Sequence, residues 1–344
     1  MEVTLDWSIG RMMSAAVIHM LTMGYALPSW SSHVSGPRVS GQATAVTESG
    51  RMLLYGGLTG SAGSPCTDTL WSHDGDAWHK VETQGEAPGP CMYAAAAAVG
   101  EDFYLVGGWD PQAPGSGGTF LSSAYKLVDG QTWERLDDLP VGPVSRHTAC
   151  AVGNLVIVHT FRGIVLLDPD TGKFREQATS GEAPDGLSMC AASPLGDGHS
   201  MLLFGGSTKT QQMSADAYVL DTTTWAWRKL KAEGADGAAV PTPRASSCAA
   251  PAGDGKSCIV YGGAGLGGGG YEGGRGLCAT DETWRVHVAG DTATWELVDA
   301  EGAKPPPRVA ASLNALKTPG KFVLQGGWDP ASKETFEATS VLAL

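Results

Sequence analysis

A short apolar run that ends in two glycines occurs five times along the chain at regular intervals. The copies end at Gly56-Gly57, Gly107-Gly108, Gly205-Gly206, Gly262-Gly263 and Gly326-Gly327. A sixth run, Val156-Ile157-Val158-His159-Thr160, keeps the apolar residues and lacks the glycines. The five intervals from Gly56 to Gly326 cover 270 residues and average 54. Self-similarity at a period of tens of residues indicates a series of equivalent units that share one continuous core.

Each repeat divides into four short segments with strand character. The first, as in residues 38–46, is rich in small residues and precedes the apolar run. After the glycines comes a segment that carries an aromatic residue. The fourth segment follows a turn of Asp, Gly and Thr. It begins with a large aromatic residue, which is Trp78, Trp133, Phe174, Trp227 or Trp295 in successive repeats. Four short strands joined by turns predict one antiparallel sheet per repeat, with the small residues near a central axis.

The sixth repeat ends at Leu344, before a fourth strand. The missing strand stands at the other end of the chain, where Trp30 leads into Pro37-Arg38 as Trp295 leads into Pro307-Arg308. We therefore predict an all-β fold, a six-bladed β-propeller of four-stranded antiparallel blades. The N-terminal strand is predicted to close the last blade, which leaves no open sheet edge where the ends meet.

Composition narrows the class of partner. The formal net charge is -13, and the sequence contains no run of Lys and Arg. Non-specific nucleic-acid binding needs clustered cations, so we expect no nucleic-acid partner. Residues 1–28 do not fit the repeat and are expected to form an N-terminal extension, either a signal peptide or a loose segment. The propeller is expected to span residues 29–344. We expect no membrane association, and a cytoplasmic location unless residues 1–28 direct secretion.

The repeats resemble the kelch family over roughly residues 30–344. The resemblance lies in the glycine pairs, in the aromatic of the third strand and in the Trp that follows it, as at Trp133 and Trp227. The third repeat departs from the pattern with His159-Thr160 and Phe174. The resemblance implies a propeller that binds a protein or peptide on one face, and we expect the protein to be a monomer. It leaves open a propeller enzyme of metal-dependent lyase or oxidase type, as in galactose oxidase-like propellers, or a carbohydrate-binding propeller.

The connections after the glycine pairs are long and should share one face, so we expect the binding site at the mouth of the ring on that face. Four arginines that open innermost strands are candidates for gripping acidic groups of a peptide: Arg38, Arg146, Arg244 and Arg308. An arginine presents a planar fork that matches a carboxylate. The alternative is that these arginines bind neighbouring loop carbonyls and are structural.

Two loop motifs add candidates. Trp109-Asp110-Pro111 and Trp328-Asp329-Pro330 follow two of the glycine pairs, and exposed Trp is common at binding hot spots. The alternative is that each Trp packs on its own loop while the Asp starts the turn. The glycine-rich residues 264–276 lack the ending of a phosphate-binding loop, so we expect a plain loop there, with Tyr271 and Arg275 as its candidate binding residues.

Catalytic and metal-binding patterns are sparse. The eight histidines are scattered, and the sequence contains neither HExxH nor GxSxG. The seven cysteines show no CxxC spacing, which favours buried free thiols over a zinc site. We therefore predict no metal and no cofactor, and the sequence favours a binding protein over an enzyme, with no catalytic residue assigned.

Overall fold

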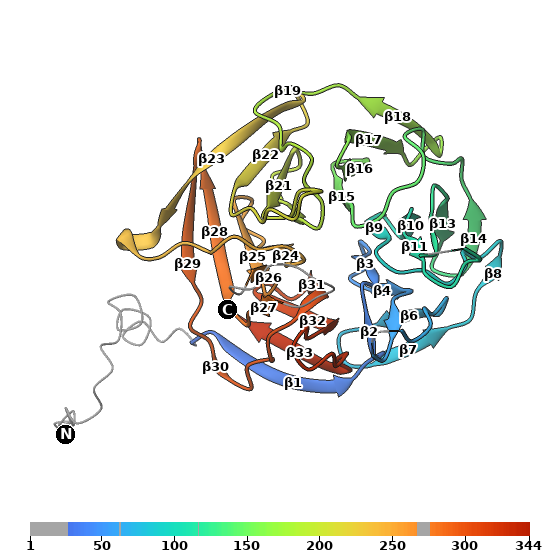
Figure 1. Ribbon diagram of the computed structural model, residues 1–344, viewed down its shortest axis with the longest axis horizontal. Helices are drawn as coiled ribbons and strands as arrows, with labels where there is room; N and C mark the ends of the chain where they lie inside the picture. Colours follow the sequence, from blue (N-terminus) through green and yellow to red (C-terminus); the bar gives the residue numbers. More distant parts are fainter. Residues whose placement is uncertain (1–26, 62, 116, 267–275) are drawn as a thin grey trace.

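The computed structural model describes residues 27–61, 63–115, 117–266 and 276–344. The regular secondary structure of the described residues is all β-strand apart from one short 3-10 helix, η1 (Ala235–Gly237). The sheets are arranged in a ring around a central axis (Figure 1). The all-β propeller expected from the repeats is therefore confirmed. No helix within the described ranges has the length and apolar character needed to cross a bilayer.

The described strands group into six four-stranded antiparallel units, here called blades 1 to 6 in chain order. Blade 1 holds β3 (Ala43–Val46), β4 (Met52–Tyr55), β6 (Leu70–His73) and β7 (Trp78–Val81). Blade 2 holds β9 (Ala95–Val99), β10 (Asp102–Val106), β13 (Ala124–Val128) and β14 (Thr132–Arg135). Blade 3 holds β15 (Thr148–Val152), β16 (Leu155–Thr160), β17 (Gly163–Asp168) and β18 (Lys173–Gln177).

The remaining blades follow the same order from the axis outward. Blade 4 holds β20 (Ala191–Pro194), β21 (Ser200–Phe204), β22 (Ala217–Asp221) and β23 (Ala226–Gly234). Blade 5 holds β24 (Cys248–Pro251), β25 (Ser257–Tyr261), β28 (Thr283–Ala289) and β29 (Thr292–Leu297). Blade 6 holds β31 (Val309–Ala315), β32 (Lys321–Trp328), β33 (Ala338–Ala343) and β1 (Ser29–Ser35).

Blade 6 joins the two ends of the chain. Its outer strand β1 runs antiparallel to β33, with Trp30 opposite Leu342 and Ser31 opposite Val341. The N-terminal strand thus completes the sheet that the C-terminal strands begin, as the repeat pattern predicts. Because these strands are some 310 residues apart in sequence, their pairing fastens the ring.

Four outer strands carry a further short strand along their free edge. These strands belong to the connection from the preceding blade, and we call them straps: β8 (Gln84–Gly85), β19 (Ser180–Gly181), the end of β23 (residues 231–234) and β30 (Glu301–Gly302). Each strap runs parallel to the outer strand of the next blade. In each, a glycine lies opposite a tryptophan: Gly85–Trp133, Gly181–Trp227, Gly234–Trp295 and Gly302–Trp30. The straps therefore bind neighbouring blades together at the outside of the ring.

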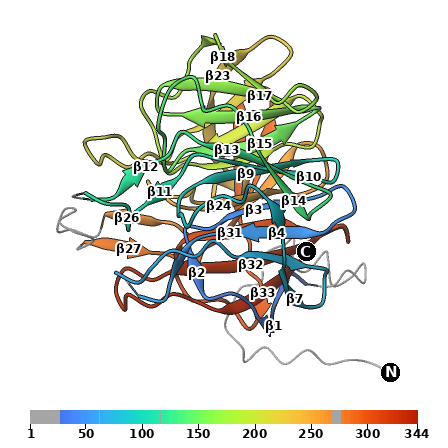
Figure 2. The ribbon, with the colours of Figure 1, turned by 90° about the vertical axis from the view of Figure 1, so that its right-hand side faces the viewer.

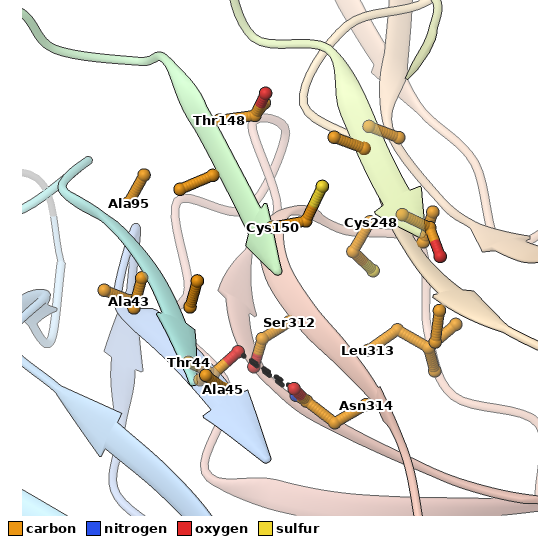
Figure 3. A pocket seen from close by; sticks show the side chains of 18 of the residues that line it. Ala43, Thr44, Ala45, Ala95, Thr148, Cys150, Cys248, Ser312, Leu313 and Asn314 are labelled. Carbon is orange, nitrogen blue, oxygen red and sulfur yellow. Dashed lines mark hydrogen bonds between the residues drawn. The ribbon is translucent and has the colours of Figure 1, made fainter. Parts of the chain in front are cut away.

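The hydrophobic core lies between adjacent blades. One cluster joins Leu202 and Phe204 of blade 4 to Val260, Trp284 and Trp295 of blade 5. The innermost strands carry mostly Ala, Ser, Thr and Cys and surround a channel of about 440 Å³. Figure 3 shows these short side chains, including Ala95, Thr148 and Cys150, along the channel. The small residues predicted near the axis therefore line this channel.

Candidate functional site

A closed ring of backbone hydrogen bonds surrounds one mouth of the channel. Its members, here called the collar, each come from one blade just before or at the start of the innermost strand: Gly41, Tyr93, Arg146, Met189, Ser246 and Ala310. Each collar N–H donates to the collar carbonyl of the preceding blade, with N···O distances of 2.6 to 3.1 Å, and Gly41 closes the circle on Ala310. All six have a positive φ between 52° and 66°. Five non-glycine residues in this uncommon conformation are held there by the shared ring.

The collar lies on the face that carries the connections after the glycine pairs, which we call the rim face. Met92, beside the collar residue Tyr93, pairs with Trp109 at the base of such a connection. Two of these connections form hairpins, β11 (Trp109–Asp110) with β12 (Thr119–Phe120) and β26 (Ala264–Leu266) with β27 (Leu277–Ala279). Both hairpins project from the same side of the ring (Figure 2). A third pair, β2 (Val39–Ser40) with β5 (Leu58–Thr59), lies between the rim connections of blades 6 and 1.

Arg146 is the cation of the collar. Its guanidinium carbon lies 4.5 Å from the centroid of the Tyr93 ring and 5.2 Å from that of Trp109. Arg146 is partly exposed, and no described carboxylate lies within ion-pair distance of it. Aromatic rings against a guanidinium attract the cation and hold it flat, while the N–H groups at its edge stay directed outward in its plane. The arrangement suits a ligand that brings an acceptor to that edge.

Two further cations lie on the rim beside blade 3. The connection of this blade is a tight turn at Phe161 and Arg162 between β16 and β17. The Phe161 ring has Lys209 Nζ 4.4 Å and the Arg162 guanidinium carbon 5.0 Å from its centroid. Neither cation pairs with a described carboxylate. The connection after β16 in blade 3, the blade that contributes Arg146 to the collar, is shorter than the corresponding connections of the other blades.

The four candidate arginines do not occupy equivalent positions in their repeats. The N–H groups of Gly206 and Gly263 donate to the carbonyls of Arg244 and Arg308. Val39, not Arg38, is the residue of blade 1 whose carbonyl lies against the corresponding glycine pair, at Gly326. Arg146 stands two residues later in its repeat, in the collar. The four candidates therefore do not form one ring, because they stand at three different places in their repeats.

Arg244 and Arg308 are buried, 2% and 1% exposed, which matches the structural alternative. Arg244 donates to Thr242 O and forms an ion pair of 2.6 Å with Glu282. Arg308 donates to the carbonyls of Pro306 and Gly326, and its guanidinium carbon lies 4.1 Å from the centroid of the Phe336 ring. Burial lowers the pKa of Arg308. Both hold loops in place and are closed to a ligand.

Arg38 lies on the surface. Its Nε donates to the Thr335 carbonyl at 2.9 Å, which joins the start of blade 1 to the rim of blade 6. Arg38 and Arg146 are thus the two predicted arginines that a partner can reach, and their role in binding stays a prediction.

The tryptophan–aspartate motifs form their own turns. Trp109 Nε1 donates to Gly117 O at 2.9 Å, and Asp110 accepts the amide of Gln112. Asp329 accepts the amides of Ala331 and Ser332, and Trp328 bridges to Thr335 across that turn. The aspartates are therefore turn formers, whereas Trp109 also contacts Arg146. Tyr271 and Arg275 lie outside the described residues.

The channel wall offers little chemistry of its own. His147 Nε2 bonds Val106 O at 3.0 Å, and burial lowers the pKa of this imidazole to about 4. Thr44 and Asn314 bond each other across the junction of blades 1 and 6 at 3.3 Å (Figure 3). Across the described ranges, no group of three or more His, Cys, Asp and Glu is gathered where it could hold a metal ion.

The remaining collar residues escaped the sequence reasoning. Tyr93 and Met189 carry no recognisable motif, and the distance from the collar to the glycine pair varies between repeats. Proline spacing is the available signal, because Tyr93, Arg146, Ser246 and Ala310 each stand three residues after a proline. In the first repeat one extra residue follows Pro37, which moves Gly41 to the fourth place.

Comparison with known proteins identifies the repeats. The profile described as "KLHDC2/KLHL20/DRC7 Kelch-repeats domain" matches residues 158–344, more than half of the chain, and the profile "Kelch motif" matches residues 90–140. The chain belongs to the kelch-repeat family. The kelch resemblance inferred from the glycine pairs is thereby confirmed.

Curated relatives share parts of this kelch region. "Serine/threonine-protein phosphatase BSL2" of Arabidopsis thaliana is 28% identical over 236 residues, which cover 56% of this chain and 22% of that protein. "Host cell factor 2" of Homo sapiens is 32% identical over 95 residues, covering 26% of this chain and 12% of that protein. The chain thus spans less than a quarter of the length of these relatives.

A solved structure extends the likeness over nearly the whole chain. "Structure of YjhT" superposes with a TM-score of 0.65 and covers 91% of this chain and 99% of that one, at 16% identity. At this identity the likeness supports the kelch fold and carries no statement about function.

Proposed function

We propose that this kelch propeller is a protein-interaction module that docks a peptide or an exposed loop of a partner at the collar on the rim face. The observation that carries the proposal is Arg146, a cation held between Tyr93 and Trp109 at the mouth of the channel without a described carboxylate partner. The ligand feature that fits it is a carboxylate, from an acidic side chain or a chain end.

Rigidity at the collar supports the proposal. The Arg146 N–H donates to the Tyr93 carbonyl at 3.1 Å, and the Arg146 carbonyl accepts the Met189 N–H at 2.8 Å. The backbone that presents the guanidinium is therefore fixed before a ligand arrives. Pre-organisation of this kind reduces the entropy lost on binding.

Charge on the rim supports the same ligand class. Arg162 and Lys209 lie on the Phe161 ring at the short rim connection of blade 3, whereas the chain as a whole carries a net charge of -13. A local cluster of cations on an acidic protein attracts an acidic segment selectively to that place.

A selection with a random peptide library displayed on phage tests the proposal. The bait is the full chain, compared with Arg146→Gln and with Arg51→Gln. Arg51 is a matched control, a partly exposed arginine that directly precedes β4 of blade 1 and forms no ion pair with a described carboxylate. Gln keeps most of the side-chain stem, so the fold should persist, and thermal unfolding checks this.

The expected result is a set of carboxylate-containing peptides that bind the wild type and Arg51→Gln equally. Loss of a charge-assisted hydrogen bond should weaken their binding to Arg146→Gln about tenfold or more. Peptides that bind Arg146→Gln as tightly as the wild type, or a selection that enriches nothing on the wild type, would contradict the proposed docking site.

A further inference from the structure

The outer edges of the blades are treated unequally, and this inequality points to a second interaction surface. The outer strands of blades 2, 4, 5 and 6 are each covered by a strap. The outer strands β7 of blade 1 and β18 of blade 3 are the last strands of their sheets among the described residues. An uncovered outer strand presents backbone N–H and C=O groups that can pair with another chain.

The straps define what such an edge accepts. In blade 2, the N–H of Gln84 donates to Gln131 O at 3.0 Å, and the N–H of Glu86 donates to Trp133 O at 3.1 Å. The same pair of bonds occurs in two other blades. The accepting carbonyls are those of Trp225 and Trp227 in blade 4, and those of Pro28 and Trp30 in blade 6. A Cβ atom on Gly85, Gly181 or Gly302 would overlap the carbonyl oxygen of the facing tryptophan. The edge therefore selects a parallel segment whose glycine, with a positive φ, lies opposite the aromatic.

β18 presents the same features without a strap. Phe174 pairs with Leu167 of β17 in the register in which Trp133 pairs with Leu127 and Trp227 with Leu220. By that register, the carbonyls of Gly172 and Phe174 face away from β17, as the bonded carbonyls do in the strapped blades. The covered tryptophans are at most 3% exposed, whereas Phe174 is partly exposed.

The connection from blade 2 to blade 3, which could have supplied a strap for β18, follows another route. Residues 136–143, which follow β14, carry Leu136, Leu139 and Val141, and these pack into the core between blades 2 and 3. On that route the connection forms no strand along β18. Its side chains still reach the strand, because Leu136 packs beside Gly172 and Asp137 forms an ion pair of 2.6 Å with Lys173. At β7, by contrast, Gly36 packs on the Trp78 ring and Thr339 accepts from its Nε1 at 2.9 Å. β18 is thus the freer of the two edges.

We propose that β18 is a β-addition site for a partner protein, which supplies an extended segment in parallel with β18, a glycine opposite Phe174 and a basic residue directly after that glycine. The basic residue follows from the charge at the neighbouring position. In blade 2, Glu86 of the strap lies 4.0 Å from Arg135 of β14, two residues after Trp133. The residue two after Phe174 is Glu176, exposed and of opposite charge. The site is separate from the collar.

Three peptides based on the strap sequence at residues 82–88 test the proposal with the full chain. They read Glu-Thr-Gln-Gly-Lys-Ala-Pro, the same with Glu in place of Lys, and the Lys peptide with Val in place of Gly. Fluorescence anisotropy of labelled peptides gives the affinities, and amide hydrogen exchange by mass spectrometry gives the site. The chain variants are Glu176→Arg and, as a control, Glu296→Arg, an exposed carboxylate on the strapped strand β29.

The Lys peptide should bind best, about threefold tighter than the Glu peptide because an exposed ion pair contributes little. The Val peptide should bind at least about tenfold more weakly, since its Cβ meets the Phe174 carbonyl. Glu176→Arg should reverse the preference between Lys and Glu, and Glu296→Arg should leave it unchanged. Exchange should slow in residues 172–177.

Four outcomes would overturn the proposal. They are equal binding of the Val and Gly peptides, a preference for Lys that survives Glu176→Arg, protection at β7 instead of β18, and binding of none of the peptides. Self-association of the free chain through β18, seen by sedimentation, would replace the partner segment by a second copy and would also overturn it.

Discussion

Two histidines at the start of blade 3 are enclosed by the core. His147 is 9% exposed and His159 is 4% exposed, with the His159 ring 5.9 Å from that of Trp227. Burial lowers the pKa of each to about 4. The third repeat has His159 where the others have glycine, so this substitution places a titratable group inside the fold.

The buried histidines make stability depend on pH. Their folded pKa lies below the ordinary value of 6.5, so the unfolded chain takes up protons first as the pH falls. The free energy of unfolding should therefore be insensitive to these groups above about pH 6.5 and should decrease from there toward pH 4. Each histidine should remove about 2 kcal/mol between pH 7 and pH 5.

His159→Phe tests this dependence by urea unfolding at pH 7 and pH 5, where carboxylates are still ionised. Phe keeps a ring against Trp227 and cannot be protonated. The variant should lose about 2 kcal/mol less than the wild type between the two pH values. Equal losses in the two proteins would mean that His159 titrates alike in the folded and unfolded chains.

Thiol reactivity follows exposure in the same way. Cys278 is exposed, whereas Cys150 and Cys190 are buried and burial raises the pKa of each to about 12. A thiolate is the reactive form, so the buried thiols should react slowly. Titration of the native protein with an aromatic disulfide reagent should show one fast thiol, and Cys278→Ser should abolish the fast phase. A fast phase that persists in this variant would contradict the expectation that the five buried thiols and the partly exposed Cys248 react slowly.

At the scale of elements, the straps depend on glycine for space as well as conformation. Gly85 has a φ of 82°, and a Cβ there would overlap the Trp133 carbonyl oxygen. Gly100 has a φ of 59°, and a Cβ there would meet nothing within 4 Å. The two positions share the left-handed conformation and differ in the contact, which makes them a matched pair.

Gly85→Ala and Gly100→Ala should therefore differ in stability. Gly100→Ala should cost about 1 kcal/mol for the left-handed conformation alone. Gly85→Ala should cost at least about 2 kcal/mol more, because the strap must move away from the Trp133 carbonyl. Urea unfolding monitored by tryptophan fluorescence measures both. Equal costs would show that the strap contributes no constraint beyond its dihedral angles.

The sequence predicts the elements better than the site. Glycine pairs and offset tryptophans recur in register, so the four-stranded units and the pairing of Trp30 with the last blade follow from local patterns. The straps are not predictable in this way, because two residues such as Gln84–Gly85 carry no strand signal of their own. The collar is not predictable either. Its six members, which include residues as different as Gly41 and Arg146, share a backbone conformation and not a residue type. Burial of Arg244 and Arg308 depends on loops that only the folded ring brings together.

For the whole molecule, the proposed docking site requires one ring that is closed by strands from the two ends of the chain. The collar needs this closure, since Gly41 of blade 1 donates to Ala310 of blade 6. The same junction holds the bond between Thr44 and Asn314 and that between Gln42 and the Gln325 carbonyl at 2.9 Å. An open ring would break the collar beside Gly41 and loosen the presentation of Arg146.

Ring closure is tested most directly by a disulfide across β1 and β33. Ser31 and Val341 lie opposite each other in this antiparallel pair, within the Cα separation that a disulfide spans. The double variant Ser31→Cys, Val341→Cys should form this bond under mild oxidation, as seen by peptide mapping. The oxidised protein should unfold on the order of 5 °C higher than its reduced form. Thiols at these two positions that stay unpaired while the protein remains folded would contradict the closed ring.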